Sequence, residues 1–330
     1  AYLFWEQSPI LTFVSSFGFF SFFHFFFFKK FNLSIDFIER LVWWLTVVYM
    51  VCFTYALLKA PMKVFLGYGE IDKDLNNARG LFRIRLTLIG AGPLYLAFYM
   101  AISKYLKTKL SKWLIITIIL FVYIALQLGR QSILISLVLG FLFLFTKVSF
   151  FKKILITLVC YGVIWFSIIS VPFISKMLEE TENQVNYNKD EDDIRIKAYK
   201  FYMVEMTTNP FTGLFGKGMY TLVDNNPYGD YINTYGRNKG LIPSDVGYAK
   251  IYLLFGVSGL LIFFIIFYRT LKQKVPEEYL YVKYYIFSLM IGSVAGSPLL
   301  GTIPIYCMAV YILYVLKNKK YNKKLLNEKK

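Results

Sequence analysis

Nine long apolar runs constrain the fold of this chain more than any other feature of its sequence. A run of about 17–25 apolar residues is long enough to cross the hydrocarbon core of a bilayer as a helix. The runs lie at residues 8–28, 41–60, 84–103, 113–129, 131–146, 153–174, 247–268, 280–296 and 298–316. Only 17% of the residues are charged and 57% are hydrophobic, whereas a soluble domain is about 25% charged. The sequence therefore predicts an all-α polytopic membrane protein with about nine transmembrane helices.

Basic residues between the runs predict how the chain is oriented. Short cytoplasmic loops of membrane proteins carry an excess of Lys and Arg. Every second connection between the runs is rich in basic residues. These segments together hold 21 basic and five acidic residues, and they are 29–40, 104–112, 147–153, 269–283 and 317–330. If these are cytoplasmic, segment 175–250, with nine basic and eleven acidic residues, lies outside. The N-terminus then lies outside too, an arrangement that fits an additional helix upstream of Ala1.

Four parts follow from this map. We expect six helices in 1–174, a large extracytoplasmic loop in 175–246, three helices in 247–316 and a basic cytoplasmic tail in 317–330. The net charge of +17 lies mostly in short loops, so we expect membrane lipids and not nucleic acid as its partners. The three cysteines show no metal-ligand spacing and are expected to be buried thiols: Cys52, Cys160 and Cys307.

The middle of the long loop predicts an amphipathic helix over residues 193–207, on the outer membrane surface or over a cavity. Its apolar residues recur near helical spacing: Ile194, Ala198, Phe201 and Val204. Asp192 and Asp193 suit the helix N-terminus, and Asn209-Pro210 is expected to end the helix. Three glycines then predict an adaptable turn: Gly213, Gly216 and Gly218.

Several basic residues are predicted on the outer face, where the positive-inside rule does not favour them. Arg130 lies between two apolar runs, where it either snorkels to lipid phosphates or clamps an anion at the mouth of a cavity. The others belong to two groups, one at the start of the third run and one on the predicted surface helix: Arg79, Arg83 and Arg85, then Arg195, Lys197 and Lys200. The second group is either a solvated stripe or part of an anion site. Because arginine donates paired hydrogen bonds to phosphate, converging arginines would suit a pyrophosphate.

Three other polar residues have alternative interpretations. Asp245, just before the seventh run, either caps a helix or acts as a general base facing an outer cavity. Arg237 is a further outer-face cation, or an ordinary loop residue. His24 lies in a run of phenylalanines and is expected to pack rather than catalyse. The sequence has no Walker, HExxH, GxSxG or CxxC motif, and no metal or cofactor is expected.

Three motifs occur in a characteristic order around the long loop. The first is the Gly-Arg-x-Ser sequence at Gly129–Ser132. The second is Arg195 followed by the Asn-Pro-Phe-x-Gly sequence at Asn209–Gly213. The third is Asp245 followed, about eleven residues later, by the Gly-x-x-Gly sequence at Gly256–Gly259. In this order, over about residues 80–315, the chain resembles the O-antigen polymerase and ligase superfamily of membrane glycosyltransferases.

The resemblance implies glycan transfer between undecaprenyl-pyrophosphate-linked repeats on the outer face of the cytoplasmic membrane. It implies that Arg130 and Arg195 neutralise the pyrophosphate leaving group without a metal. The remaining outer-face cations are the other expected substrate-binding residues: Lys200, Arg79, Arg83, Arg85 and Arg237. Asp245 is the expected general base by its position alone. A lipid-linked donor and acceptor, and a chain-length regulator protein, are the expected partners.

Three other functions remain open. Ligases of the superfamily, which transfer glycan to lipid A-core, usually have His-Asn where this chain has Asp245-Val246, a difference that favours a polymerase. A lipid-linked oligosaccharide flippase is the alternative from another class. Such transporters have charges near the bilayer midplane and broken helices, whereas the unexplained charges here are predicted at the outer rim. A structural membrane subunit would not need those arginines.

Overall fold

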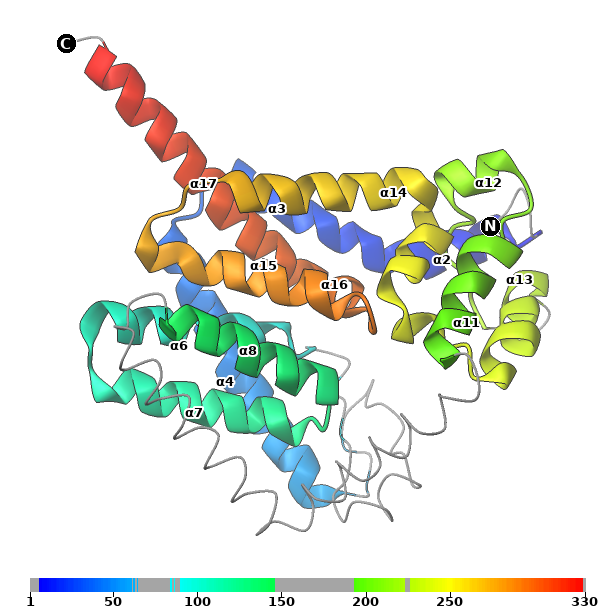
Figure 1. Ribbon diagram of the computed structural model, residues 1–330, viewed down its shortest axis with the longest axis horizontal. Helices are drawn as coiled ribbons and strands as arrows, with labels where there is room; N and C mark the ends of the chain where they lie inside the picture. The colour runs from blue at the N-terminus through cyan, green and yellow to red at the C-terminus, as the bar shows by residue number, and fades with distance from the viewer. Residues whose placement is uncertain are drawn as a thin grey trace. The chain divides into compact units, whose positions relative to one another are not determined.

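The computed structural model describes residues 6–60, 62, 64, 84, 86, 90–145, 193–222 and 226–328, with side chains described as far as Asn318. Most of these residues are helical, and no β-strand occurs among them (Figure 1). Three helical segments are long and apolar enough to cross a membrane: Pro9–Lys30, Ile35–Lys59 and Gly247–Lys272. Within the described residues, the all-helical prediction is confirmed, and the apolar helices indicate a membrane-embedded protein.

Most of the apolar runs correspond to helices whose boundaries differ from the predicted ones. In chain order these are α2 (Pro9–Ser16), the 3₁₀ segment η1 (Phe17–Phe22), α3 (Phe23–Lys30), α4 (Ile35–Lys59), α6 (Gly92–Thr108), α7 (Ser111–Leu126), α8 (Arg130–Phe145), α14 (Gly247–Lys272), α15 (Leu280–Gly292), α16 (Pro298–Gly301) and α17 (Ile303–Glu328). The predicted helix at 153–174 lies outside the described residues.

In the third apolar run, residues 84–103, the helix begins later than predicted. Ile84 and Leu86 are buried but not helical. Gly90 has a positive φ of 63°, and Pro93 occupies the first turn of α6. Because a left-handed glycine interrupts a helix and proline favours its first turn, α6 starts at Gly92 and not at residue 84.

Contacts divide the chain into two units, and each is described by itself. One unit comprises residues 1–41 and 193–330. In it α17 packs along α3 through aromatic pairs, with the Tyr311 ring centroid 6.3 Å from that of Phe25 and 5.8 Å from that of Phe28. The Tyr311 hydroxyl donates to the Leu33 carbonyl at 2.8 Å, beyond the end of α3. These contacts fix the ends of α3 and α17 against each other.

The second unit, residues 42–192, contains most of α4 together with α6, α7 and α8. α7 packs beside α6, and α8 packs on both. At one end of this bundle the Lys104 ammonium lies over two indole rings, 5.6 Å from the Trp43 centroid and 4.9 Å from the Trp113 centroid. Gly140 of α8 faces Phe98 of α6, where an added Cβ would lie 3.0 Å from the ring. The small residue therefore allows these two helices to approach closely.

The long loop folds into a series of short helical elements. They are α11 (Ile194–Lys200), the π-helical η2 (Phe201–Glu205), α12 (Pro210–Phe215), α13 (Pro227–Tyr231), η3 (Ile232–Gly236), η4 (Arg237–Lys239) and η5 (Pro243–Asp245). Their buried side chains form one apolar cluster with the start of α14, made of Ala198, Phe201, Tyr202, Met206, Tyr228, Ile232, Leu241, Val246, Ala249 and Leu253. The described part of the loop is thus a packed structure.

The predicted helix at 193–207 exists, but its buried face is not the predicted one. Asp193 caps α11 as expected, because its side chain accepts from the backbone N–H of Arg195 at 2.7 Å. Ile194 and Val204, expected inside, are exposed, Val204 by 64%. The backbone N–H of Met206 donates to the Phe201 carbonyl, an i to i+5 bond that rotates the following side chains. Met206 is therefore buried in place of Val204.

Candidate functional site

The helix α14, which is long and apolar enough to cross a membrane, is broken at Gly256. This residue has φ 65° and ψ −162° inside an otherwise helical segment. A break of this kind leaves backbone groups without their helical partners. The segment after α12 supplies donors, because Lys217 N–H donates to the Leu253 carbonyl at 2.7 Å and Gly218 N–H to the Leu254 carbonyl at 3.2 Å. The loop therefore completes the hydrogen bonding of the interrupted helix.

Two glycines make this backbone crossing sterically possible. A Cβ on Gly216 would lie 2.4 Å from the Leu254 carbonyl carbon, and a Cβ on Gly256 would lie 2.4 Å from the Leu214 carbonyl carbon. Gly216 also has a positive φ of 77° with ψ −177°, a region open essentially to glycine alone. We call this crossing of α12 and α14 the interlock. It brings the Asn-Pro-Phe-x-Gly and Gly-x-x-Gly motifs of the sequence together, and its turn is fixed by contacts where the sequence predicted an adaptable one.

Gln7 links the start of the chain to the segment that follows the interlock. Its side chain is 1% exposed. Its Nε2 donates to the Met219 carbonyl at 3.0 Å, and its Oε1 accepts from Thr221 N–H at 3.3 Å and from Asn226 Nδ2 at 3.1 Å. More than 210 residues separate the two segments along the chain. The sequence analysis missed Gln7, because no local pattern indicates a contact at that separation.

Lys217, also missed from the sequence, is the buried cation of the interlock. Its side chain is 3% exposed, and burial lowers the pKa of its ammonium group to about 8. Next to it, the Tyr228 hydroxyl donates to the Gly218 carbonyl at 3.2 Å. In the sequence Lys217 resembles any other loop lysine, so only the packing of the loop on α14 reveals it.

Arg195 and Lys200 are exposed on α11. The helix is held by Tyr199, whose hydroxyl donates to the Val294 carbonyl of the α15–α16 turn at 2.8 Å, and by Tyr202, whose hydroxyl donates to the Leu241 carbonyl. These two anchors fix α11 and leave its cations accessible to a ligand.

Arg237 lies near the tyrosines of the loop core. Burial raises the pKa values of the Tyr202 and Tyr220 hydroxyls, and the positive charge of Arg237 opposes both shifts. The Arg237 side chain is itself exposed. The structure thus places Arg195, Lys200 and Arg237 in the same unit.

Asp245 is exposed at the end of η5 and does not cap α14. The capping position is Val246, which makes no side-chain capping bond, so the capping interpretation is wrong. The helix instead starts against the end of α15, where a Cβ on Gly247 would lie 2.0 Å from the Gly296 carbonyl oxygen. The Ser244 hydroxyl donates to Asp245 Oδ1 at 3.4 Å. A role for Asp245 as a general base stays a prediction.

The Gly-Arg-x-Ser motif forms the turn between α7 and α8 in the second unit. Arg130 is the half-buried first residue of α8, where the helix dipole does not favour a cation. The Tyr95 hydroxyl of α6 donates to Gln127 Oε1 at 3.1 Å, and the side chain of Ser132 lies close to that hydroxyl. The sequence analysis did not select Tyr95 or Gln127. Three further predicted residues lie outside the described residues: Arg79, Arg83 and Arg85.

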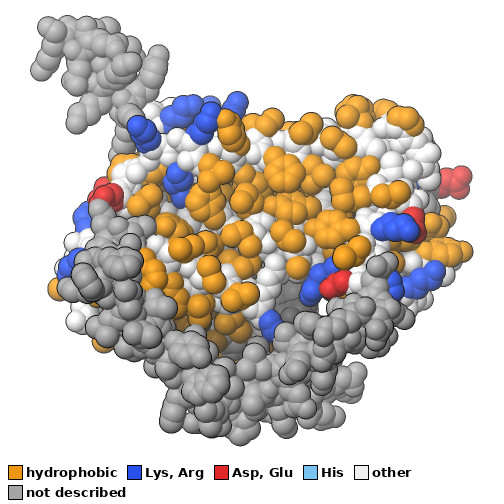
Figure 2. All heavy atoms as spheres, in the orientation of Figure 1, with side chains coloured by type: hydrophobic (Ala, Val, Ile, Leu, Met, Phe, Trp, Pro, Cys, Tyr) orange, Lys and Arg blue, Asp and Glu red, His pale blue; other side chains and the backbone are white. Residues whose placement is uncertain are grey.

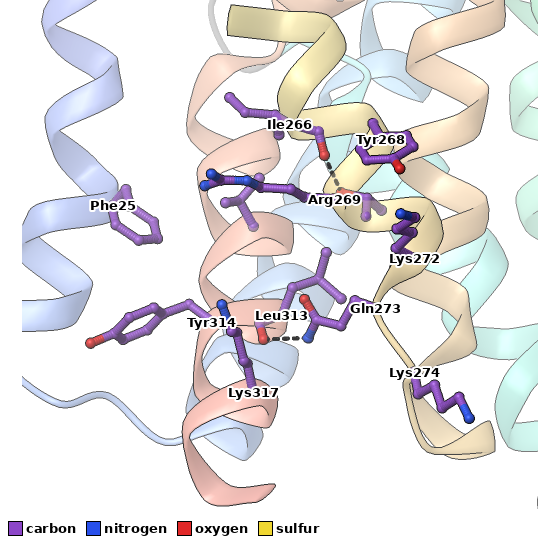
Figure 3. Close-up of a pocket in the computed structure, with 12 residues that line it drawn as sticks. Phe25, Ile266, Tyr268, Arg269, Lys272, Gln273, Lys274, Leu313, Tyr314 and Lys317 are labelled. Atoms are coloured by element: carbon purple, nitrogen blue, oxygen red, sulfur yellow. Dashed lines mark hydrogen bonds between the residues drawn. The ribbon is translucent and has the colours of Figure 1, made fainter. Parts of the chain in front are cut away.

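Grooves in the described part of the chain include two between membrane-length or apolar helices. One, of about 770 Å³, lies between α3, α14 and α17 (Figure 3); the other, of about 400 Å³, lies between α4 and α7. None of the predicted site residues lines either groove. His24 is exposed, with Nδ1 2.7 Å from the Ser21 carbonyl oxygen, and no group of metal-ligating side chains occurs among the described residues. Of the described cysteines, Cys307 is a buried free thiol as expected, whereas Cys52 is a half-buried one.

No protein-family model, curated protein or solved structure matches this chain. Its function is therefore argued from its own residues and their geometry.

Proposed function

We propose that this chain is a membrane glycan polymerase with about nine transmembrane helices. It transfers a growing glycan from its undecaprenyl pyrophosphate onto the next lipid-linked repeat, producing O-antigen, capsule or exopolysaccharide. The reaction takes place on the outer face of the cytoplasmic membrane, where the loop between the sixth and seventh helices covers the lipid-linked sugars. The proposal rests on the resemblance of the three motifs and on the following observations.

The interlock is the observation that carries the proposal. Two of the three motifs that support the resemblance are about 40 residues apart in the sequence, yet their glycines lie in direct backbone contact. The two motifs therefore belong to one packed element of the fold. The contact also attaches α12 to a membrane-crossing helix, which holds the loop, and α11 within it, at the end of α14.

The accessible cations supply the chemistry that the reaction needs. Glycosyl transfer expels a pyrophosphate anion, and fixed positive charges lower the barrier by stabilising the charge as it develops. Arg195 is exposed on an anchored helix, and Arg130 begins α8 beside the Tyr95–Gln127–Ser132 cluster. The exposed carboxylate of Asp245 is available to accept the proton of an acceptor hydroxyl. Lys200 and Arg237 are the further substrate-binding cations.

One observation favours a transporter as the second candidate. Many transporters use broken membrane helices whose free backbone ends bind ligands, and α14 is broken at Gly256. In this chain, however, the free carbonyls of Leu253 and Leu254 accept from the loop backbone. The break thus serves internal packing, and we prefer the polymerase.

Polymer length in cells tests the proposal. We expect Arg130→Ala, Arg195→Ala and Asp245→Ala each to lower the rate of polymerisation by about 10²–10³-fold, so that single repeats accumulate on a glycan gel. Arg195→Lys is expected to retain part of the activity, because it keeps the charge and loses the paired donor geometry. Lys239→Ala is the matched control, since it removes another outer-loop cation that packs over Tyr235.

Immunoblotting establishes that each variant is present in the membrane. Normal polymer in all three alanine variants would contradict the assigned site. Long chains that form without reaching their final acceptor would identify a ligase, and repeats retained on the inner leaflet would identify a transporter.

A further inference from the structure

A groove at the basic end of the first unit has a composition unlike that of an ordinary helix junction. It holds about 770 Å³ between α3, the last turns of α14 and the middle of α17. Four of its lining residues are basic, namely Arg269, Lys272, Lys274 and Lys317, and none is acidic. The remainder are mostly apolar or aromatic. The groove therefore offers positive charge beside an apolar wall.

Two of the four cations face the same part of the groove. In Figure 3 the Arg269 side chain extends from α14 toward Phe25 of α3, and the Lys317 side chain lies beside Tyr314 of α17. Lys272 instead lies over the ring of Tyr268, 4.6 Å from its centroid, and Lys274 points away from α17 in the same view. Arg269 and Lys317 are thus the two groove cations that lie toward α3 in this view.

Hydrogen bonds hold the walls of the groove in place. Gln273 Nε2 donates to the Leu313 carbonyl at 2.7 Å, which joins the end of α14 to α17. Lys283 of α15 donates to the Leu271 and Gln273 carbonyls at 2.8 and 3.2 Å. Lys29 at the end of α3 lies over the Tyr314 ring, 5.4 Å from its centroid. The groove is consequently built before any ligand arrives.

The groove lies where apolar helices reach their first basic residues. α3 ends at Lys29 and Lys30, and the last turn of α14 contains Arg269 and Lys272. The neighbouring surface of α14 is apolar, with Leu261, Ile262, Phe264, Ile265, Tyr268 and Leu271 exposed. Figure 2 shows hydrophobic side chains over much of the visible face, with Lys and Arg gathered near the start of the C-terminal segment. A ligand bound here has its charged part at the level of lipid headgroups.

We propose that this groove binds one anionic phospholipid. Its phosphate lies between Arg269 and Lys317, and an acyl chain lies along the apolar wall formed by Phe25, Val310 and Leu313. Basic pockets between membrane helices bind anionic headgroups in this manner. A free phosphate or nucleotide would leave that apolar wall exposed. The proposal concerns the C-terminal end of α14, whereas Asp245 precedes the N-terminal end of that helix, and it does not depend on glycan transfer.

Lipid retention by the purified protein tests the proposal. The protein is reconstituted in nanodiscs of phosphatidylcholine with a minor fraction of phosphatidylglycerol, and bound lipids are counted by native mass spectrometry. We expect the unchanged chain to retain one phosphatidylglycerol in preference to phosphatidylcholine. Each basic residue near a membrane surface contributes a factor of about five to anionic-lipid affinity. The double variant Arg269→Gln/Lys317→Gln is therefore expected to lose affinity by about 25-fold.

Two further variants separate the site from net charge and from misfolding. Lys30→Gln/Arg40→Gln removes the same charge from exposed positions that do not line the groove, and it is expected to keep the bound lipid. Arg269→Lys/Lys317→Arg keeps both charges and is expected to keep most of the affinity. Equal lipid loss in the groove and control variants would overturn the proposal. So would retention that ignores headgroup charge, or displacement of the lipid by millimolar inorganic phosphate, which would identify a free-phosphate site.

Discussion

The interlock of α12 with α14 and the turn between α7 and α8 both contain glycines that stand out in the sequence. The structure requires glycine only in the interlock. At Gly216 and Gly256 the backbone conformation and the opposing backbone leave no room for a side chain. At Gly129 the φ angle is not positive, and an added Cβ would lie 3.4 Å from Ser132 Oγ, an ordinary contact. The left-handed residue of that turn is Leu128, with φ 57°.

This difference separates architecture from chemistry. The interlock requires its glycines in order to fold, so these residues support the fold whatever reaction the chain performs. The α7–α8 turn does not require Gly129, so the importance of its motif depends on the side chains of Arg130, Ser132 and their neighbours. Activity measurements on the two regions are informative only once their effects on folding are known.

Gly256→Ala is expected to have the largest effect. The substitution places a Cβ 2.4 Å from the backbone of Leu214 at φ 65°, and strain together with overlap should destabilise the fold by more than about 3 kcal/mol. We expect a lower yield of monodisperse protein in detergent and a lower midpoint of thermal unfolding. Gly216→Ala should act in the same way. A Gly256→Ala protein as stable as the parent would show that the interlock is not rigid.

Lys217→Met is expected to have an intermediate effect that depends on pH. Burial lowers the Lys217 pKa from its ordinary 10.5 to about 8, so the folded state binds this proton less tightly than the unfolded state does. The cost of burying Lys217 is fully present below about pH 8 and disappears as the pH rises toward 10.5. The methionine variant should therefore be more stable than the parent at pH 7, with the difference shrinking above pH 8.

Thermal unfolding of the parent and the Lys217→Met variant across this pH range measures that difference directly. Lys239→Met is the control, since Lys239 is exposed and should give no pH-dependent difference. A constant offset between the Lys217→Met variant and the parent at every pH would contradict the buried titration.

Gly129→Ala is expected to have the smallest effect, between no change and a stabilisation of about 1 kcal/mol, because it lowers the entropy of the unfolded chain at a position where a Cβ fits. The midpoint of thermal unfolding and the polymer pattern in cells should both match those of the parent. Loss of stability comparable to that of Gly256→Ala would remove the distinction between the two regions.

Local sequence signals predicted local structure well. Asp193 caps α11, and Asn209 caps α12 through a 2.9 Å bond from Thr212 N–H to its side chain, because a capping bond involves only residues two or three apart. Asn209-Pro210 was expected only to end a helix, and it also starts a new one. Asp245 looked like a cap for the same local reason, but contacts with the end of α15 set the start of α14 instead.

The sequence by itself determined the helical character of the described residues, most of their apolar helices and the capping of α11. Apolar runs and capping residues act over a few neighbouring positions. Tertiary structure alone decided the break in α14, the position of Gln7 and the assembly of the basic groove. Each of these joins backbone or side chains from distant parts of the chain: Gly216 with Gly256, Gln7 with Asn226, and Phe25 with Arg269 and Lys317. Close packing selects such pairings, because it excludes water and leaves no room for extra side-chain atoms. The periodicity of a single segment contains no information about them.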